Sequence, residues 1–159
     1  METVEINVFT FDELTEEAKE KAREWMRQDY DPAWNDEALE SITEFCDHFR
    51  IALKGYSVGA YEPLDYNAEY FNSHFRGRKL RDFDREYMPT GYCLDCDLWM
   101  TFYDVFKATG DSKRAFDDAL EAGFKAWRRD LEWQLSDECI DELLLINEYR
   151  FTASGKFWG

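Results

Sequence analysis

The stretch KRAFDDALEAGFKAWRRDLEWQL (residues 113–135) decides the fold class that we predict for this chain. Its large apolar residues recur at steps of three and four, which is the spacing of one face of an α-helix. These residues are Phe116, Leu120, Phe124, Trp127 and Leu131. The stretch therefore predicts a long helix with one buried face.

Apolar periodicity and capping residues predict four further helices on either side of this one. The first is expected to be capped by Thr10 with Glu13 or by Thr15 alone, and the second by Asn35. The cap expected for the long helix is Asp111 or Ser112. The five predicted helices run over about residues 14–28, from Asn35 to Phe49, over 95–107, over 113–135, and from the cap Ser136 to Asn147.

Alternating polar and apolar residues predict a few short strands. One is expected over Val4–Phe11, and two or three more in the middle of the chain, in LKGYSVGAY (residues 53–61) and around residues 66–71. The ending EYRFTASGKFW (residues 148–158) predicts a hairpin. Together the elements predict an α+β fold, with a small, mostly antiparallel sheet covered on one face by about five helices. We expect a single domain over residues 1–159.

The composition is strongly acidic and yet rich in core-forming residues. The chain has 35 Asp and Glu against 19 Lys and Arg, a formal net charge of −16, with 45% hydrophobic residues. Intrinsic disorder is disfavoured by this apolar content. Direct binding to nucleic acid or to an anionic membrane is disfavoured by the charge. The partner that suits the charge is a basic surface on another protein.

The acidic excess is concentrated near the start of the chain, where residues 1–50 hold 15 acidic and 5 basic residues. In FDELTEEAKEKAREWM (residues 11–26), carboxylates gather on the side of the helix opposite its apolar face, and the helix that follows repeats the pattern. The candidate partner-binding residues are Glu13, Glu16, Glu17, Glu20, Glu24, Asp36, Glu37, Glu40, Glu44 and Asp47. Adjacent acidic rows on two helices approach the charge spacing of one DNA strand, whereas a solvated helix face is the simpler interpretation.

No motif indicates catalysis or a bound cofactor, so we expect a protein that is not an enzyme. Cys93 and Cys96 form a lone CxxC, and a zinc site would have to draw its other ligands from Cys46, His48 and His74. The set considered adds Cys46 and His48. A redox or metal-dependent role for this pair is the alternative from the enzyme class. With neither a second CxxC nor a nucleophile motif present, we expect no catalytic residues, no metal and no cofactor.

A second alternative is a structural or regulatory interaction module that acts through the tyrosine-rich middle segment, without nucleic-acid mimicry. Its anchors would be Tyr56, Tyr61, Tyr66 and Tyr70, and a homodimer is one form that it would take. The basic patch over residues 76–85 is expected to form a short helix or a loop that pairs with an acidic helix. The start METVEINVF has no signal-peptide pattern, so we expect a cytoplasmic protein.

Two segments together resemble a group of small acidic phage and prophage proteins. They are FDELTEEAKEKAREW (residues 11–25) and LEWQLSDECIDELLLINEYRFTASGKFW (residues 131–158). The resemblance covers the first and last quarters of the chain and implies a mobile-element origin and a bacterial host cell. It implies no catalytic residues. Our leading hypothesis is a non-enzymatic inhibitor, of the anti-CRISPR or antirestriction type, that binds the basic groove of a host nucleic-acid enzyme as a nucleic-acid mimic.

Overall fold

The chain, described over all of residues 1–159 by a computed structural model, divides into two units. The middle unit comprises residues 33–132, and the terminal unit joins residues 1–32 to residues 133–159. Each unit has a hydrophobic core of its own. The single domain expected from the sequence stays a prediction, and the two units are described separately below.

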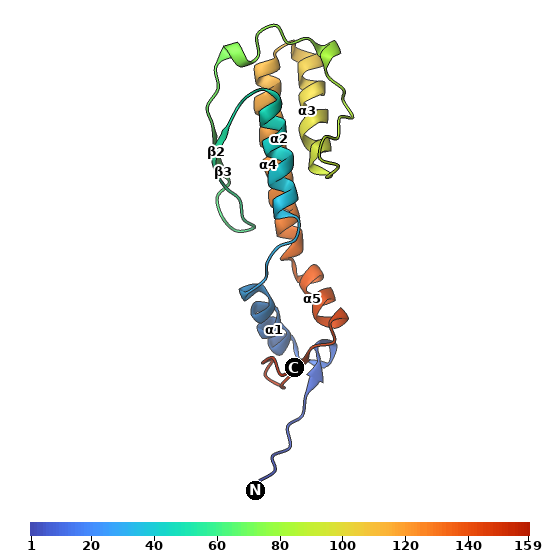
Figure 1. Cartoon of the computed structure of the whole chain (residues 1–159). Helices are drawn as coiled ribbons and strands as arrows, with labels where there is room; N and C mark the ends of the chain where they lie inside the picture. The colour runs from blue at the N-terminus through green and yellow to red at the C-terminus, as the bar shows by residue number, and fades with distance from the viewer. The chain divides into compact units, whose positions relative to one another are not determined.

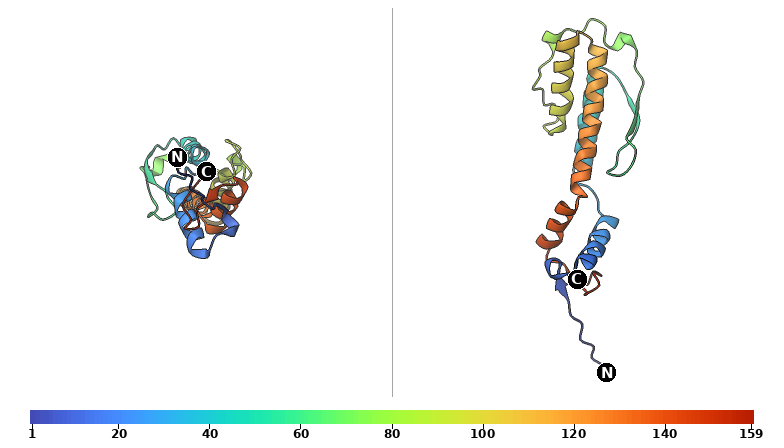
Figure 2. Two further views of the ribbon diagram at one scale, coloured as in Figure 1. Left: turned by 90° about the horizontal axis from the view of Figure 1, so that it is seen from below. Right: turned by 180° about the vertical axis from the view of Figure 1, so that it is seen from behind.

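The middle unit consists of three helices and a β-hairpin. In both ribbon views, α3 and the hairpin lie on opposite sides of the α2 and α4 pair (Figures 1 and 2). The elements of this unit are α2 (Asn35–His48), β2 (Leu53–Ser57), β3 (Asp65–Ala68), two 3-10 turns (Asn72–His74 and Leu80–Asp82), α3 (Leu94–Thr109) and α4 (Ser112–Gln134), of which residues 133 and 134 belong to the terminal unit.

Aromatic rings fill the core between the three helices. Phe45 of α2 stacks on Phe116 of α4 with ring centroids 5.1 Å apart. The Trp99 ring of α3 and the Phe45 ring meet edge to face, with centroids 4.9 Å apart. Helices α3 and α4 approach closely where Gly123 faces Leu98, since a Cβ on Gly123 would lie 2.5 Å from the Leu98 Cδ2 atom. The apolar face predicted for residues 113–135 is thus the centre of this unit.

The hairpin packs on α4 through tyrosines. Strands β2 and β3 are antiparallel and pair Tyr56 with Tyr66. The Tyr66 ring stacks on Phe124 with centroids 4.4 Å apart and planes 5° from parallel, and Tyr56 contacts Trp127 at 5.5 Å. These contacts give the hairpin an apolar support, which a two-stranded ribbon requires for stability.

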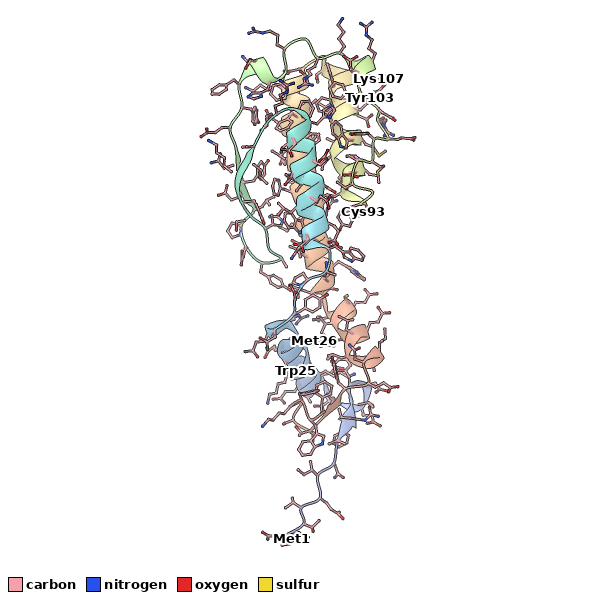
Figure 3. The ribbon with its side chains drawn as sticks, viewed as in Figure 1. Met1, Trp25, Met26, Cys93, Tyr103 and Lys107 are labelled. Atoms are coloured by element: carbon pink, nitrogen blue, oxygen red, sulfur yellow. The ribbon has the colours of Figure 1, made fainter.

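The terminal unit pairs the start of the chain with its end. Helices α1 and α5 pack together over a small core, and the Trp25 ring, labelled on α1 in Figure 3, stacks on Phe157 with centroids 4.3 Å apart. Figure 3 also places Met1 at the far end of the extended first residues. The elements are β1 (Phe9–Thr10), a 3-10 turn (Phe11–Glu13), α1 (Glu16–Gln28), α5 (Asp137–Ile146) and β4 (Arg150–Phe151).

The predicted C-terminal hairpin is present, and it packs against α1. Backbone hydrogen bonds join Thr152 to Lys156 and Gly155 to Thr152, and β4 also pairs with β1 in antiparallel register. Gly155 has a φ of 90°, and a Cβ at this position would lie 2.2 Å from the carbonyl oxygen of Ala18. Glycine is therefore required here both by conformation and by space.

Several sequence predictions are confirmed. The fold is α+β with antiparallel strands. In place of the single sheet expected, the strands form one two-stranded sheet in each unit, because β1 pairs only with β4 and β2 only with β3. The five helices lie within a few residues of their predicted ranges. Thr15 caps α1, Asp111 accepts a hydrogen bond from the Arg114 amide at the start of α4, and Ser136 caps α5.

Two local predictions are wrong. The strand expected over Val4–Phe11 is limited to Phe9 and Thr10, because its partner β4 offers only two residues and Phe11 already begins a 3-10 turn. Asn35 is not the N-cap of α2. It is the first helical residue, and its side-chain oxygen instead accepts a hydrogen bond from the indole Nε1 of Trp127 at 2.8 Å, so Trp34 takes the cap position.

Candidate functional site

The acidic face of α2 has the exposure and charge expected of a partner-binding surface. Its five carboxylates are all exposed, and none forms an ion pair or accepts a side-chain hydrogen bond, as the chain's ion pairs all lie elsewhere. The helix carries no Lys or Arg. The five residues, called the α2 stripe below, are Asp36, Glu37, Glu40, Glu44 and Asp47.

Helical geometry places the α2 stripe on one side of the helix. At 3.6 residues per turn, its members lie within an arc of about 100°, opposite the buried Ile42 and Phe45. From Asp36 to Asp47 the stripe is about 16 Å long at a rise of about 1.5 Å per residue, so successive charges are about 4 Å apart along the axis. One strand of DNA has a charge about every 3.4 Å. The α2 stripe alone thus approaches the axial charge density of one strand.

Helix α1 differs from α2 although its acidic residues are equally exposed. Glu13 lies in the preceding turn, where it accepts a hydrogen bond from the Thr10 amide at 2.8 Å. Over residues 16–28 the helix has four Glu balanced by four Lys and Arg. Glu16 pairs with Lys19 at 3.6 Å, and Glu20 pairs with Arg23 at 3.1 Å. Glu17 and Glu24 complete the predicted α1 set, and no ion pair holds them.

The arginines of α1 bind the helix to α5. Arg23 donates two hydrogen bonds to Asp141, and Arg27 donates to the carbonyl of Leu135 at 2.9 Å and to the Asp137 carboxylate. Hydrogen bonding to Arg27 lowers the pKa of Asp137. The polar face of α1 is therefore largely engaged within its own unit, whereas the α2 stripe is not engaged. Because α1 and α2 belong to different units, their side-by-side packing stays a prediction.

A stacked aromatic pair lies at the N-terminal end of the α2 stripe, in which Trp34 is exposed and Tyr92 is half-buried against the core. Trp34 is 57% exposed, has a φ of 72°, and stacks on Tyr92 with centroids 6.2 Å apart. Burial is the main cause that raises the pKa of Tyr92, and the negative charges that add to the shift include Glu37 of the stripe. Exposed Trp and Tyr are frequent anchors of protein interfaces. Sequence reasoning missed this pair, because Trp34 and Tyr92 are far apart in the chain and no local pattern joins them.

A buried carboxylate holds Tyr92 in place. Asp95 is fully buried at the start of α3, and its Oδ2 accepts hydrogen bonds from the Thr90 amide at 3.0 Å, the Thr90 hydroxyl at 2.8 Å and the Gly91 amide at 3.1 Å. The Thr90 hydroxyl also lies 2.9 Å from that of Ser41 on α2. This network attaches the loop before α3 to α2, beside the acidic stripe.

The tyrosines of the middle segment divide into two groups. Tyr66 and Tyr70 pack against core aromatics, and burial raises the pKa of Tyr66. Tyr61 is 78% exposed and Tyr56 is 46% exposed. Only the second pair is available as an interface anchor.

The structure does not assemble the zinc site considered from the sequence. Cys46 is fully buried in the core of the middle unit, where burial raises the pKa of its thiol to about 12. Cys93 lies at the N-terminal end of α3 (Figure 3) and, like Cys96, is exposed. No group of three or more His, Cys, Asp or Glu side chains is placed to hold a metal ion. The Cys96 Sγ instead lies 3.4 Å from the Met88 Sδ.

The basic patch over residues 76–85 is a loop with one 3-10 turn. Arg85 forms an ion pair with Asp104 of α3, which lowers the pKa of that carboxyl. Arg76, Arg78, Lys79 and Arg81 form no ion pair. The one ion pair of the patch is therefore with α3, and not with α1 or α2.

Comparisons with known proteins provide no family for the chain. No protein-family model matches it, and neither a curated protein nor a solved structure is significantly similar to it. None of its helices combines the length and the apolar character that crossing a membrane requires.

Proposed function

We propose that the protein is a non-enzymatic inhibitor that binds the basic, nucleic-acid-binding surface of a host defence enzyme. In this proposal it is encoded by a phage or prophage and acts in the cytoplasm of a bacterial host, as the resemblance of its terminal segments implies. The contact surface is the α2 stripe, with Trp34 and Tyr92 at one end. The free carboxylates of α1 are a second acidic surface, on the terminal unit.

The single observation that supports this proposal is that the α2 stripe is exposed and forms no ion pair. Five carboxylates on one helix side repel one another, and none forms an ion pair within the chain. Binding to a basic partner therefore relieves more electrostatic repulsion in this stripe than on α1, where Lys and Arg already neutralise the carboxylates. Its charge spacing supports competition with a nucleic-acid strand for the same groove.

The proposal is tested by phage plating on bacteria that carry restriction or CRISPR systems. Expression of the wild-type chain is expected to raise the plating of a sensitive phage at least tenfold on at least one defended strain, and to leave an undefended strain unchanged. An α2 variant (Asp36→Asn, Glu40→Gln, Glu44→Gln and Asp47→Asn) should lose this rescue.

A matched α1 variant removes the same number of charges from exposed positions of α1 and of the turn that precedes it. It combines Glu13→Gln, Glu16→Gln, Glu17→Gln and Glu24→Gln. Retained rescue in this variant would assign the contact to α2, and loss in both variants would assign it to both helices. If no defended strain is rescued, or if the α2 variant rescues as well as the wild type, the proposal is wrong.

A second candidate, an interaction module without nucleic-acid mimicry, is favoured by one observation. Tyr61 is 78% exposed beside β3, with no ring contact of its own. In that case the α2 variant should keep its partner binding, and Tyr61→Ala should lose it in a manner insensitive to salt.

A further inference from the structure

A basic cavity lies at the C-terminal end of α2, in the middle unit. Its volume is about 660 Å³, within the range of small-molecule pockets. The cavity is formed where the end of α2 meets the loop between β3 and α3. The residues that determine its charge are His48, Arg50, His74, Arg76, Arg78 and Asp82.

The charge of this cavity contrasts with that of the whole chain. Three arginines line it against one carboxylate, although the chain has 35 acidic and 19 basic residues. None of the three arginines forms an ion pair, whereas the nearby Arg85 pairs with Asp104. Guanidinium groups that line one cavity without a carboxylate partner favour the binding of an anion there.

Packing and hydrogen bonds organise part of the lining. The guanidinium of Arg78 lies over the Phe49 ring, 5.1 Å from its centroid, and its Nε donates to the carbonyl of His74 at 3.2 Å. His74 Nδ1 lies 3.2 Å from the Phe49 carbonyl oxygen and must be the donor, because a carbonyl only accepts. Burial, and then the charge of Arg78, lower the pKa of His48. The lowered pKa disfavours the charged form of His48, whereas the three arginines keep their positive charge.

We propose that this cavity binds the phosphate chain of a nucleoside polyphosphate, an inference independent of the proposed inhibitor function. Three guanidinium groups can donate hydrogen bonds to the many oxygens of a phosphate chain. A ligand with a single carboxylate has too few oxygens to pair with all three. The volume exceeds what one phosphate group needs. Beside the cavity, Phe71 is 72% exposed and nearly parallel to the His74 ring, at 15° between planes. This aromatic surface provides a stacking platform for a base.

The test uses ATP as the probe, without divalent cations and at 0.15 M salt, where the distant acidic residues are largely screened. Calorimetry should detect one saturable site. The variant Arg50→Gln/Arg76→Gln, at two exposed positions, should bind ATP at least tenfold more weakly. The control Arg114→Gln/Arg128→Gln removes two arginines from α4 and should bind like the wild type. Asp82→Asn removes the one opposing carboxylate and should bind more tightly.

A second readout comes from the two histidines of the chain, since both line the cavity. Their ring resonances should shift as ATP saturates the site, and inorganic pyrophosphate should bind more weakly than ATP because it lacks the base. The proposal is overturned if ATP does not saturate, if both histidine signals stay fixed, or if the two double variants weaken binding equally. Equal affinity for ATP and pyrophosphate would overturn the assignment to a nucleoside.

Discussion

Arg23 of α1 donates two hydrogen bonds to the carboxylate of Asp141 on α5, with Nε 2.6 Å from Oδ1 and Nη2 2.8 Å from Oδ2. The guanidinium also lies 5.6 Å from the centroid of the Phe11 ring. The pair explains why two helices with the same acidic pattern differ at the surface. The basic residues of α1 neutralise carboxylates of their own unit, and α2 has no such residues.

Replacing Arg23 should destabilise the terminal unit. The pair is partly buried, with side-chain exposures of 13% and 28%, and its hydrogen bonds are charge-assisted. We expect Arg23→Gln to lower the free energy of unfolding by about 1–2 kcal/mol in urea titrations followed by circular dichroism. The control Arg114→Gln breaks an exposed pair with a 4.0 Å separation and should cost at most about 0.5 kcal/mol. Equal losses of unfolding free energy in the two variants would show that the Arg23–Asp141 pair stabilises the protein no more than an exposed ion pair does.

Gly123→Ala should destabilise the middle unit although alanine is the better helix former. The gain in helix propensity is about 0.8–1 kcal/mol. The new Cβ would lie 2.5 Å from fully buried Leu98, and overpacking of this kind costs about 1–3 kcal/mol. A net loss is therefore expected in thermal unfolding. Thr43→Ala, at an exposed position of α2, should be neutral or slightly stabilising, and a similar gain in Gly123→Ala would refute the close approach.

Asp117 should make stability depend on pH. Burial, and then the charge of Asp118, raise its pKa, and its Oδ1 is buried without a partner. A raised pKa in the folded state means that stability is lost as the pH rises from the ordinary aspartate pKa through the raised value. Asp117→Asn should therefore be more stable than the wild type at pH 7.

The advantage of Asp117→Asn should shrink as the pH falls through the raised pKa, because the wild-type carboxyl is then neutral in the folded state as well. Urea midpoints from pH 7 down to pH 4 measure this difference. Asp65→Asn, at an exposed position of β3, provides the baseline for a simple change of charge. A gain that is the same at every pH would contradict the assignment to Asp117 ionisation.

Trp34 should contribute to partner binding and little to folding. It is 57% exposed at the start of α2. In the plating assay, Trp34→Ala should lose rescue at least tenfold while its unfolding midpoint stays close to that of the wild type. Trp133→Ala removes a tryptophan of similar exposure, 51%, and should keep full rescue. Unchanged rescue by Trp34→Ala would show that the aromatic pair does not contact the partner.

The sequence was most informative where local chemistry decides the structure. Strong apolar periodicity and the cap Asp111 placed the long helix at residues 113–135, and the structure has it at Ser112–Gln134. The alternation of polar and apolar residues over Val4–Phe11 predicted a strand that is too long. Strand length depends on the partner strand, and β4 supplies only two residues. The role of Asn35 depended on Trp127, 92 positions away, which no local pattern reveals.

The same distinction applies to the candidate site. The spacing of the acidic residues on α2 was enough to predict one exposed stripe, which the structure describes. The attachment of α1 to α5 was not predictable, because the partner Asp141 is 118 positions from Arg23. Similarly, the basic cavity joins Arg50 to a loop more than twenty residues later in the chain. Pairing across such distances is decided by tertiary packing and not by periodicity.

The most direct test of the central claim is DNA cleavage by purified bacterial restriction and CRISPR nucleases in the presence of this protein. The account predicts that at least one nuclease is inhibited by the wild-type chain and by Trp133→Ala, with inhibition that weakens as salt increases. The α2 variant should fail to inhibit that nuclease even though it remains folded. Undiminished inhibition by the α2 variant, or cleavage by every nuclease at the full rate, would contradict the claim that α2 mimics a nucleic-acid strand.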